Sequence, residues 1–77
     1  MIFVTNDNVM GKNIRHYRCR MGLSRYALAE LTGIKEWQIM DLEEDNTREI
    51  RGEDLEKLCD VFHTSLQSLV ENKIICE

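Results

Sequence analysis

The stretch SRYALAELTGIKEWQIMDLEE, residues 24–44, decides how this chain folds. Ser24 is a favoured N-cap residue, and residues 25–32 that follow it carry apolar side chains at helical spacing. Gly33 supplies the positive φ that ends a helix, so this first helix has only about two turns. A second helix is predicted over residues 35–44. The stretch therefore predicts two short helices that are joined by a tight glycine turn.

The second helix of this stretch has two unlike faces. Ile39 and Leu42 point one way, and with Ile34 they are expected to bury the back of the helix. The opposite, exposed face carries Trp37, Met40, Asp41 and Glu44. A short helix, a tight turn and a second helix with a buried back form a helix-turn-helix, whose front face fits a DNA major groove about 12 Å wide.

Three more helices are predicted outside this pair. The apolar residues before it recur on one helical face: Met10, Ile14, Tyr17 and Met21. Asp7 or Asn8 can cap that helix, and Gly22 ends it. The inward stripe of a fourth helix comprises Leu55, Leu58, Cys59 and Phe62. Ser65 caps a short fifth helix, whose residues expected to be buried are Leu66, Leu69 and Val70.

The segments outside these helices are expected to form a loop and short strands. Residues 45–52 are polar and have no clear period, so they are expected to form a loop. Residues 2–5 and 73–76 are short runs rich in β-branched residues, and either can form a strand. No linker or internal repeat divides the chain, so residues 1–77 are expected to form one domain.

Composition narrows the class of protein. The three cysteines form no CxxC pair and are odd in number, which argues against a disulfide framework and for a reducing, cytoplasmic setting. Cys59 is expected to be a buried small hydrophobe, and Cys19 to lie on the outer face of the first helix. His16 and His63 lack neighbours at metal-ligand spacing, so we expect no metal and no cofactor.

Two further classes are not expected. The apolar runs are far shorter than the roughly 20 residues that span a bilayer, so no contact with a membrane is predicted. The first residues also lack the charge and apolar order of a signal peptide. No nucleophile, base and orienting group can be assembled from the sequence, so the chain is not expected to be an enzyme.

The ordered set of residues over roughly 9–71 resembles the Cro-like, phage-repressor family of helix-turn-helix domains. The residues that carry the resemblance are Gly11, Lys12, Asn13, Ile14, Arg15, Arg18, Gly22, Leu23, Ser24, Leu28, Ala29, Glu30, Gly33, Ile34, Ile39, Leu42, Glu43, Leu55, Leu58, Phe62, Ser65, Leu66 and Leu69. The resemblance implies an all-α fold of five helices, with residues 1–8 and 72–77 as extensions.

The resemblance also implies residue roles. The base-reading positions are Lys35, Glu36, Trp37, Gln38 and Asp41. The phosphate-binding positions are Arg25, Arg48 and Arg51. Arg18 and Glu43 match an internal ion pair that joins the first and third helices of the family. The chain departs from the family pattern in three places. Glutamine is common where this chain has Arg25, and Glu44-Asp45 replace small or basic residues followed by a glycine. The exposed face of the third helix carries Trp37, Met40, Asp41 and Glu44 in place of the usual polar and basic set.

The charge pattern leaves two functions open. Net charge is −4, but basic residues dominate from 12 to 25 and acidic residues from 30 to 60. The first function is a sequence-specific, DNA-binding transcriptional regulator, a homodimer on a palindromic double-stranded operator. The second is a helix-turn-helix fold used as a protein-interaction module, for example an antagonist of another regulator. The face of Trp37 and Met40 fits thymine methyl groups or a protein partner equally well.

Overall fold

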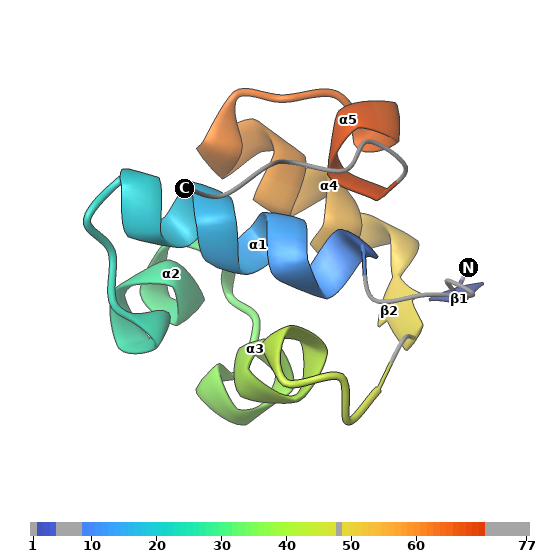
Figure 1. The fold of residues 1–77 in the computed structure, drawn as a ribbon, viewed down its shortest axis with the longest axis horizontal. Coiled ribbons are helices and arrows are strands. Elements are labelled where there is room, and N and C mark those ends of the chain that lie inside the picture. Colours follow the sequence, from blue (N-terminus) through green and yellow to red (C-terminus); the bar gives the residue numbers. More distant parts are fainter. Residues whose placement is uncertain (1, 5–8, 48, 71–77) are drawn as a thin grey trace.

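Five helices and two short strands make up the described part of the chain, residues 2–4, 9–47 and 49–70, in a computed structural model (Figure 1). Their order and bounds are β1 (Ile2–Val4), α1 (Val9–Arg20), α2 (Arg25–Thr32), α3 (Glu36–Glu43), β2 (Glu49–Arg51), α4 (Gly52–Phe62) and α5 (Leu66–Val70). The expected five-helix, phage-repressor-like fold is confirmed. No helix among these residues is long and apolar enough to cross a membrane.

Local signals set the ends of α2 as predicted. The side-chain oxygen of Ser24 accepts a hydrogen bond from the Ala27 N–H at 3.0 Å, which is an N-cap bond. Gly33 has φ 77°, and its N–H donates to the Ala29 carbonyl at 2.8 Å. Gly22 has φ 71°, just beyond α1. Glycine adopts this left-handed conformation without the steric cost that a Cβ brings, so both turns are sharp.

The core forms where α1 crosses the other helices. In Figure 1, α1 runs across the middle of the molecule, with α3 below it and α4 and α5 above it. The buried apolar residues come from every helix and from β2: Met10, Ile14, Leu28, Ile34, Ile39, Leu42, Ile50, Leu55, Leu58, Cys59, Phe62 and Leu69. The predicted inward stripe of α4 and the predicted back of α3 are thus buried as expected.

Two residues of the predicted core are exposed instead. Met21 is 45% exposed because α1 ends at Arg20, so the helical face does not continue to it. Leu66 is 40% exposed because α5 has little more than one turn, and only its far side, at Leu69, reaches the core. Both errors came from extending a helical face beyond the residues that contact another helix.

A two-stranded antiparallel sheet replaces part of the expected loop over residues 45–52. β1 pairs with β2 in the register Ile2↔Arg51, Phe3↔Ile50 and Val4↔Glu49. Ile50 is buried while its two neighbours in β2 are exposed, which is the alternation of a strand with one covered face. The loop prediction was wrong at this strand. The N-terminal strand is confirmed for residues 2–4, and the C-terminal run at 73–76 lies outside the described residues.

Candidate nucleic-acid interface

The helix α3 presents a polar and aromatic face to solvent. Ile39 is fully buried and Leu42 is 3% exposed, and they hold the back of α3 against the core. Trp37 is 60% exposed and Met40 is 37% exposed on the other side. This arrangement leaves the front of α3 free to contact a ligand as large as a nucleic acid.

Arg18 and Glu43 lie together, as the family resemblance implies. Arg18 Nε donates to Glu43 Oε2 at 2.7 Å, and Arg18 Nη2 donates to Glu43 Oε1 at 2.9 Å. A third nitrogen, Nη1, donates to the Leu23 carbonyl at 2.9 Å. The Glu43 side chain has no exposed surface, and its hydrogen bonds raise the pKa of Arg18 above the ordinary value. The pair therefore ties α1 and the turn after it to α3.

Arg25 joins this ion pair, which the sequence analysis missed. Its Nε lies 3.3 Å from Glu43 Oε1, and its Nη2 lies 3.7 Å from Glu44 Oε1. The first residue of α2 therefore meets the last residue of α3 and the residue that follows it. Arg25 and Glu44 both depart from the family pattern and have opposite charges, and these two departures are the sequence signal for their contact. The cluster of Arg18, Arg25, Glu43 and Glu44 is electrically balanced.

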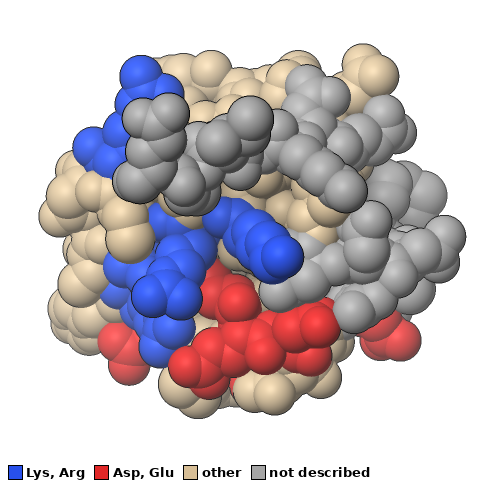
Figure 2. All heavy atoms as spheres, viewed as in Figure 1, with Lys and Arg blue, Asp and Glu red and all other residues tan. Residues whose placement is uncertain are grey.

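Basic and acidic side chains meet on the face that α1 and α3 share. Figure 2 shows basic side chains over α1 and a band of acidic side chains below them, on the side of α3. Lys12 and Arg15 are exposed on α1, and Glu44 is exposed at the end of α3. A phosphate backbone is attracted to the basic side chains over α1 and repelled by the acidic side chains on the side of α3.

The predicted base-reading residues lie along α3 and at its start. Lys35 and Glu36 are exposed like Trp37, whereas Gln38 and Asp41 are half-buried. Lys35 is the N-cap residue, and its N–H donates to Gln38 Oε1 at 3.2 Å. The side chain of Gln38 thus helps to cap α3, a role for which its position three residues after the N-cap is typical. Asn46 Nδ2 donates to Asp41 Oδ1 at 3.4 Å, across the turn after α3.

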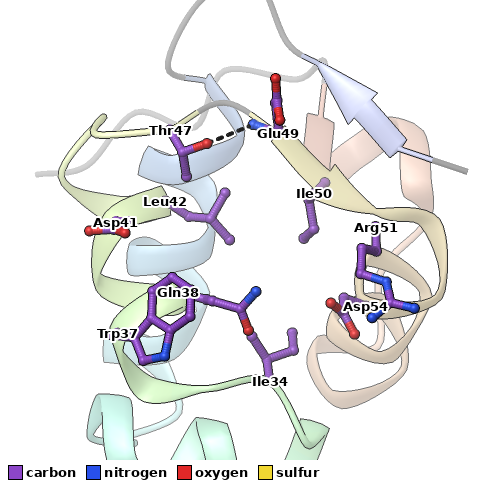
Figure 3. Close-up of a pocket in the computed structure, with 10 residues that line it drawn as sticks. All are labelled: Ile34, Trp37, Gln38, Asp41, Leu42, Thr47, Glu49, Ile50, Arg51 and Asp54. Atoms are coloured by element: carbon purple, nitrogen blue, oxygen red, sulfur yellow. Dashed lines mark hydrogen bonds between the residues drawn. The ribbon is translucent and has the colours of Figure 1, made fainter.

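A groove of about 300 Å³ separates α3 from the start of α4 (Figure 3). Its floor is apolar and consists of Ile34, Leu42 and Ile50. Its walls carry Trp37, Gln38, Asp41, Thr47, Glu49, Arg51 and Asp54. The sequence does not reveal this groove, because its far wall contains the strand β2, at residues where the sequence predicts a loop.

The other predicted phosphate-binding residues lie near this far wall. Arg51, at the junction of β2 and α4, forms an exposed ion pair between its Nη2 and Glu53 Oε1. Arg48 lies outside the described residues. Of the three predicted phosphate-binding residues, Arg25 and Arg51 are therefore described, and each is paired with a glutamate.

Comparison with known proteins identifies the fold family. The profile of the Cro/C1-type HTH DNA-binding domain matches residues 13–72. The N-terminal DNA-binding domain of SinR from Bacillus subtilis is 26% identical, with a TM-score of 0.83 over 90% of this chain and 100% of that one. The P22 c2 repressor, solved in complex with a synthetic operator, is 27% identical, with a TM-score of 0.76 over 82% of this chain and 94% of that one.

A third solved structure, the biofilm regulator SinR in complex with DNA, is 27% identical to this chain. Its TM-score is 0.76, and the match covers 80% of this chain and 98% of that one. The comparison with curated proteins gives no match.

Proposed function

The chain belongs to the family of Cro/C1-type HTH DNA-binding domains, and on this premise we propose that it is a sequence-specific, DNA-binding transcriptional regulator. The observation that supports the proposal best is that the front of α3 is exposed while its back is buried in the core. The solved relatives that match this arrangement include domains that were crystallised with DNA. The helix α3 is the element that enters the major groove.

Five residues at the start and front of α3 are proposed to contact bases: Lys35, Glu36, Trp37, Gln38 and Asp41. The amide oxygen of Gln38 accepts from the Lys35 N–H, so its amide nitrogen is the group that can serve as a donor to a base. A donor of this kind fits the N7 acceptor of a purine. The exposed ring of Trp37 fits the methyl group of thymine, and the carboxylate of Asp41 fits the amino group of cytosine.

Three arginines are proposed to bind phosphates: Arg25, Arg48 and Arg51. Arg25 is the strongest candidate because it begins α2, where the free N–H groups of a helix N-terminus also favour an anion. The side chain of Arg25 must then exchange its contact with Glu44 for a phosphate oxygen. Glu43 keeps Arg18 as a partner during this exchange, so the link between α1 and α3 is preserved.

A dimer is proposed for binding an operator. One reading helix contacts only a few base pairs, so a second copy is needed for high affinity. Two copies related by a two-fold axis place their α3 helices about 34 Å apart on a palindromic site. The β-branched run at 73–76 is proposed to contribute to this contact. Deleting residues 72–77 should therefore weaken self-association in sedimentation, and an unchanged dimer constant would argue against this role.

Selection from a pool of randomised duplexes at about 50 mM salt tests the DNA-binding function. We expect an enriched palindrome and a salt dependence with a log–log slope of about −7 for a dimer, from four phosphate contacts per subunit, made by the three arginines and by Lys35. Arg25→Gln should weaken binding to all sequences and make the slope shallower by about one per subunit. Gln38→Ala should leave the slope unchanged and relax discrimination at one base pair by roughly 1–3 kcal/mol.

Arg25→Gln and Gln38→Ala serve as controls for one another. The first neutralises a side chain of α2, and the second shortens a polar side chain of α3. If both change the slope equally, the separation into phosphate and base contacts is wrong. If no duplex in the pool is bound, the proposed function fails as a whole.

A further inference from the structure

The turn after α3 brings Asn46 back beside Asp41. The Asn46 N–H donates to the Asp41 carbonyl at 2.9 Å, and the Thr47 N–H donates to the same oxygen at 3.4 Å. Asp45, between them, has φ 62°, the left-handed conformation that closes a turn of this kind at the end of a helix. The backbone of the turn therefore places residue 46 next to residue 41 without any help from the two side chains.

The side chains of this pair are in contact as well. Asn46 Nδ2 donates to Asp41 Oδ1 at 3.4 Å, and Asn46 is exposed while Asp41 is half-buried. Within the described part of the chain, Asp41 Oδ2 receives no hydrogen bond. Figure 3 shows the Asp41 carboxylate turned away from the groove between α3 and α4. One oxygen of the carboxylate is thus engaged by a neutral donor, and the other is available to a ligand outside the groove.

We propose that Asn46 is a positioning residue for base reading, which orients the Asp41 carboxylate so that its Oδ2 accepts from the amino group of one base. In the major groove that amino group is N4 of cytosine or N6 of adenine. The selected operator distinguishes these two sources of the same chemistry. The inference rests on the proposed function, and it adds to the base-reading set a residue that acts through Asp41.

Orientation matters because every base pair presents an amino group beside an acceptor. Cytosine N4 lies next to guanine O6, and adenine N6 lies next to thymine O4. A carboxylate accepts from the amino group and is repelled by the neighbouring oxygen, so its direction decides which base it favours. The contact of 3.4 Å is long for a hydrogen bond. It therefore biases the direction of the carboxylate and leaves the base contact itself to Asp41.

A double-mutant cycle on the full chain tests this role, with anisotropy on the selected duplex and on duplexes that carry one replaced base pair each. Asp41→Ala should lower discrimination about tenfold at one base pair. Asn46→Ala should lower it about threefold at the same base pair. The double variant should lose no more than Asp41→Ala alone, because Asn46 then has no carboxylate to orient. The log–log salt slope should stay unchanged in all three variants, since no phosphate contact is lost.

Two controls separate positioning from a general effect on the turn. Gln38 caps the start of α3, far along the helix from Asn46, so Gln38→Ala and Asn46→Ala should act independently on different base pairs. Asp45→Gly removes a charge from the same turn but retains its positive φ, which glycine adopts readily. It should leave discrimination at the base pair of Asp41 within about twofold, although it changes the charge beside Asn46.

Every other outcome overturns the inference. Equal weakening of all duplexes by Asn46→Ala, with a shallower salt slope, would make Asn46 a phosphate contact. Relaxed discrimination at a second base pair that persists in the Asp41→Ala background would make Asn46 a base contact in its own right. Unchanged discrimination in Asn46→Ala, on a duplex that the wild type selects, refutes the positioning role alone. If no duplex is selected, the proposed function fails, and the positioning role fails with it.

Discussion

Breaking the Arg18–Glu43 pair should leave most of the protein molecules unfolded at 37 °C. The Glu43 side chain is 0% exposed and that of Arg18 is 13% exposed, so removal of one partner leaves the other charge largely shielded from water, and Glu43 then keeps only the longer contact with Arg25, at 3.3 Å. Such a loss costs roughly 3–5 kcal/mol. A core of this size supplies a net stability of only about 3–5 kcal/mol. Arg18→Met and Glu43→Leu should therefore each consume nearly the whole free energy of unfolding.

The double variant Arg18→Met/Glu43→Leu should be more stable than either single variant. An apolar pair in place of a buried ion pair is often neutral, because neither charge is left unpaired. Two smaller losses remain. The Leu23 carbonyl loses its hydrogen bond from Arg18, at roughly 0.5–1.5 kcal/mol, and Arg25 loses Glu43 but keeps Glu44 and contact with water. We therefore expect the double variant to lie about 1–2 kcal/mol below the wild type.

Urea unfolding followed by circular dichroism at 10–25 °C, with linear extrapolation to water, measures these differences. The exposed pair Arg51–Glu53 is the control, and Arg51→Met with Glu53→Gln should change the stability by less than about 1 kcal/mol. The reasoning is refuted if the loss of stability in the double variant equals the sum of the losses in the two single variants. It is also refuted if each single variant lies within about 1 kcal/mol of the wild type.

Two other predictions concern charge and thiols. Glu44→Gln should tighten binding to a mixed-sequence duplex about fivefold per subunit, because Arg25 Nη2 then has no contact with Glu44 to give up when it reaches a phosphate. Anisotropy should show no such gain for Asp60→Asn, an equal charge change on α4. Cys59 is buried and burial raises its pKa, so it should stay unmodified by an aromatic disulfide reagent at pH 8 while exposed Cys19 reacts; equal rates at the two sites, read by mass spectrometry, would refute the burial of Cys59.

Features that depend on neighbours in the sequence were predictable, and those that depend on distant segments were not. The helix α2 begins after Ser24 and ends at Gly33 as predicted, because cap and stop are local signals. The strand β2 was missed, since its partner strand β1, residues 2–4, lies more than forty residues away in the sequence.

The same division applies to the candidate site. The exposed face of α3 followed from helical periodicity, and the Arg18–Glu43 pair followed from the family resemblance. The position of Arg25 between Glu43 and Glu44 depends on how α2 approaches the end of α3, which no local pattern states. The cap that Gln38 provides was not predictable, because Lys35 is not one of the residue types that open a capping box.

The pairing of β1 with β2 also has a kinetic consequence. It joins residues 2–4 to residues 49–51, so it closes a long loop for two strands of three residues each. Contacts of such long range form late in folding, and short ladders open before helices do. We expect the amide of Ile50 to exchange with solvent hydrogen faster than those of Leu55 and Leu58 in α4. The far wall of the groove would then open and close on its own, without any change in the helix that is proposed to read DNA.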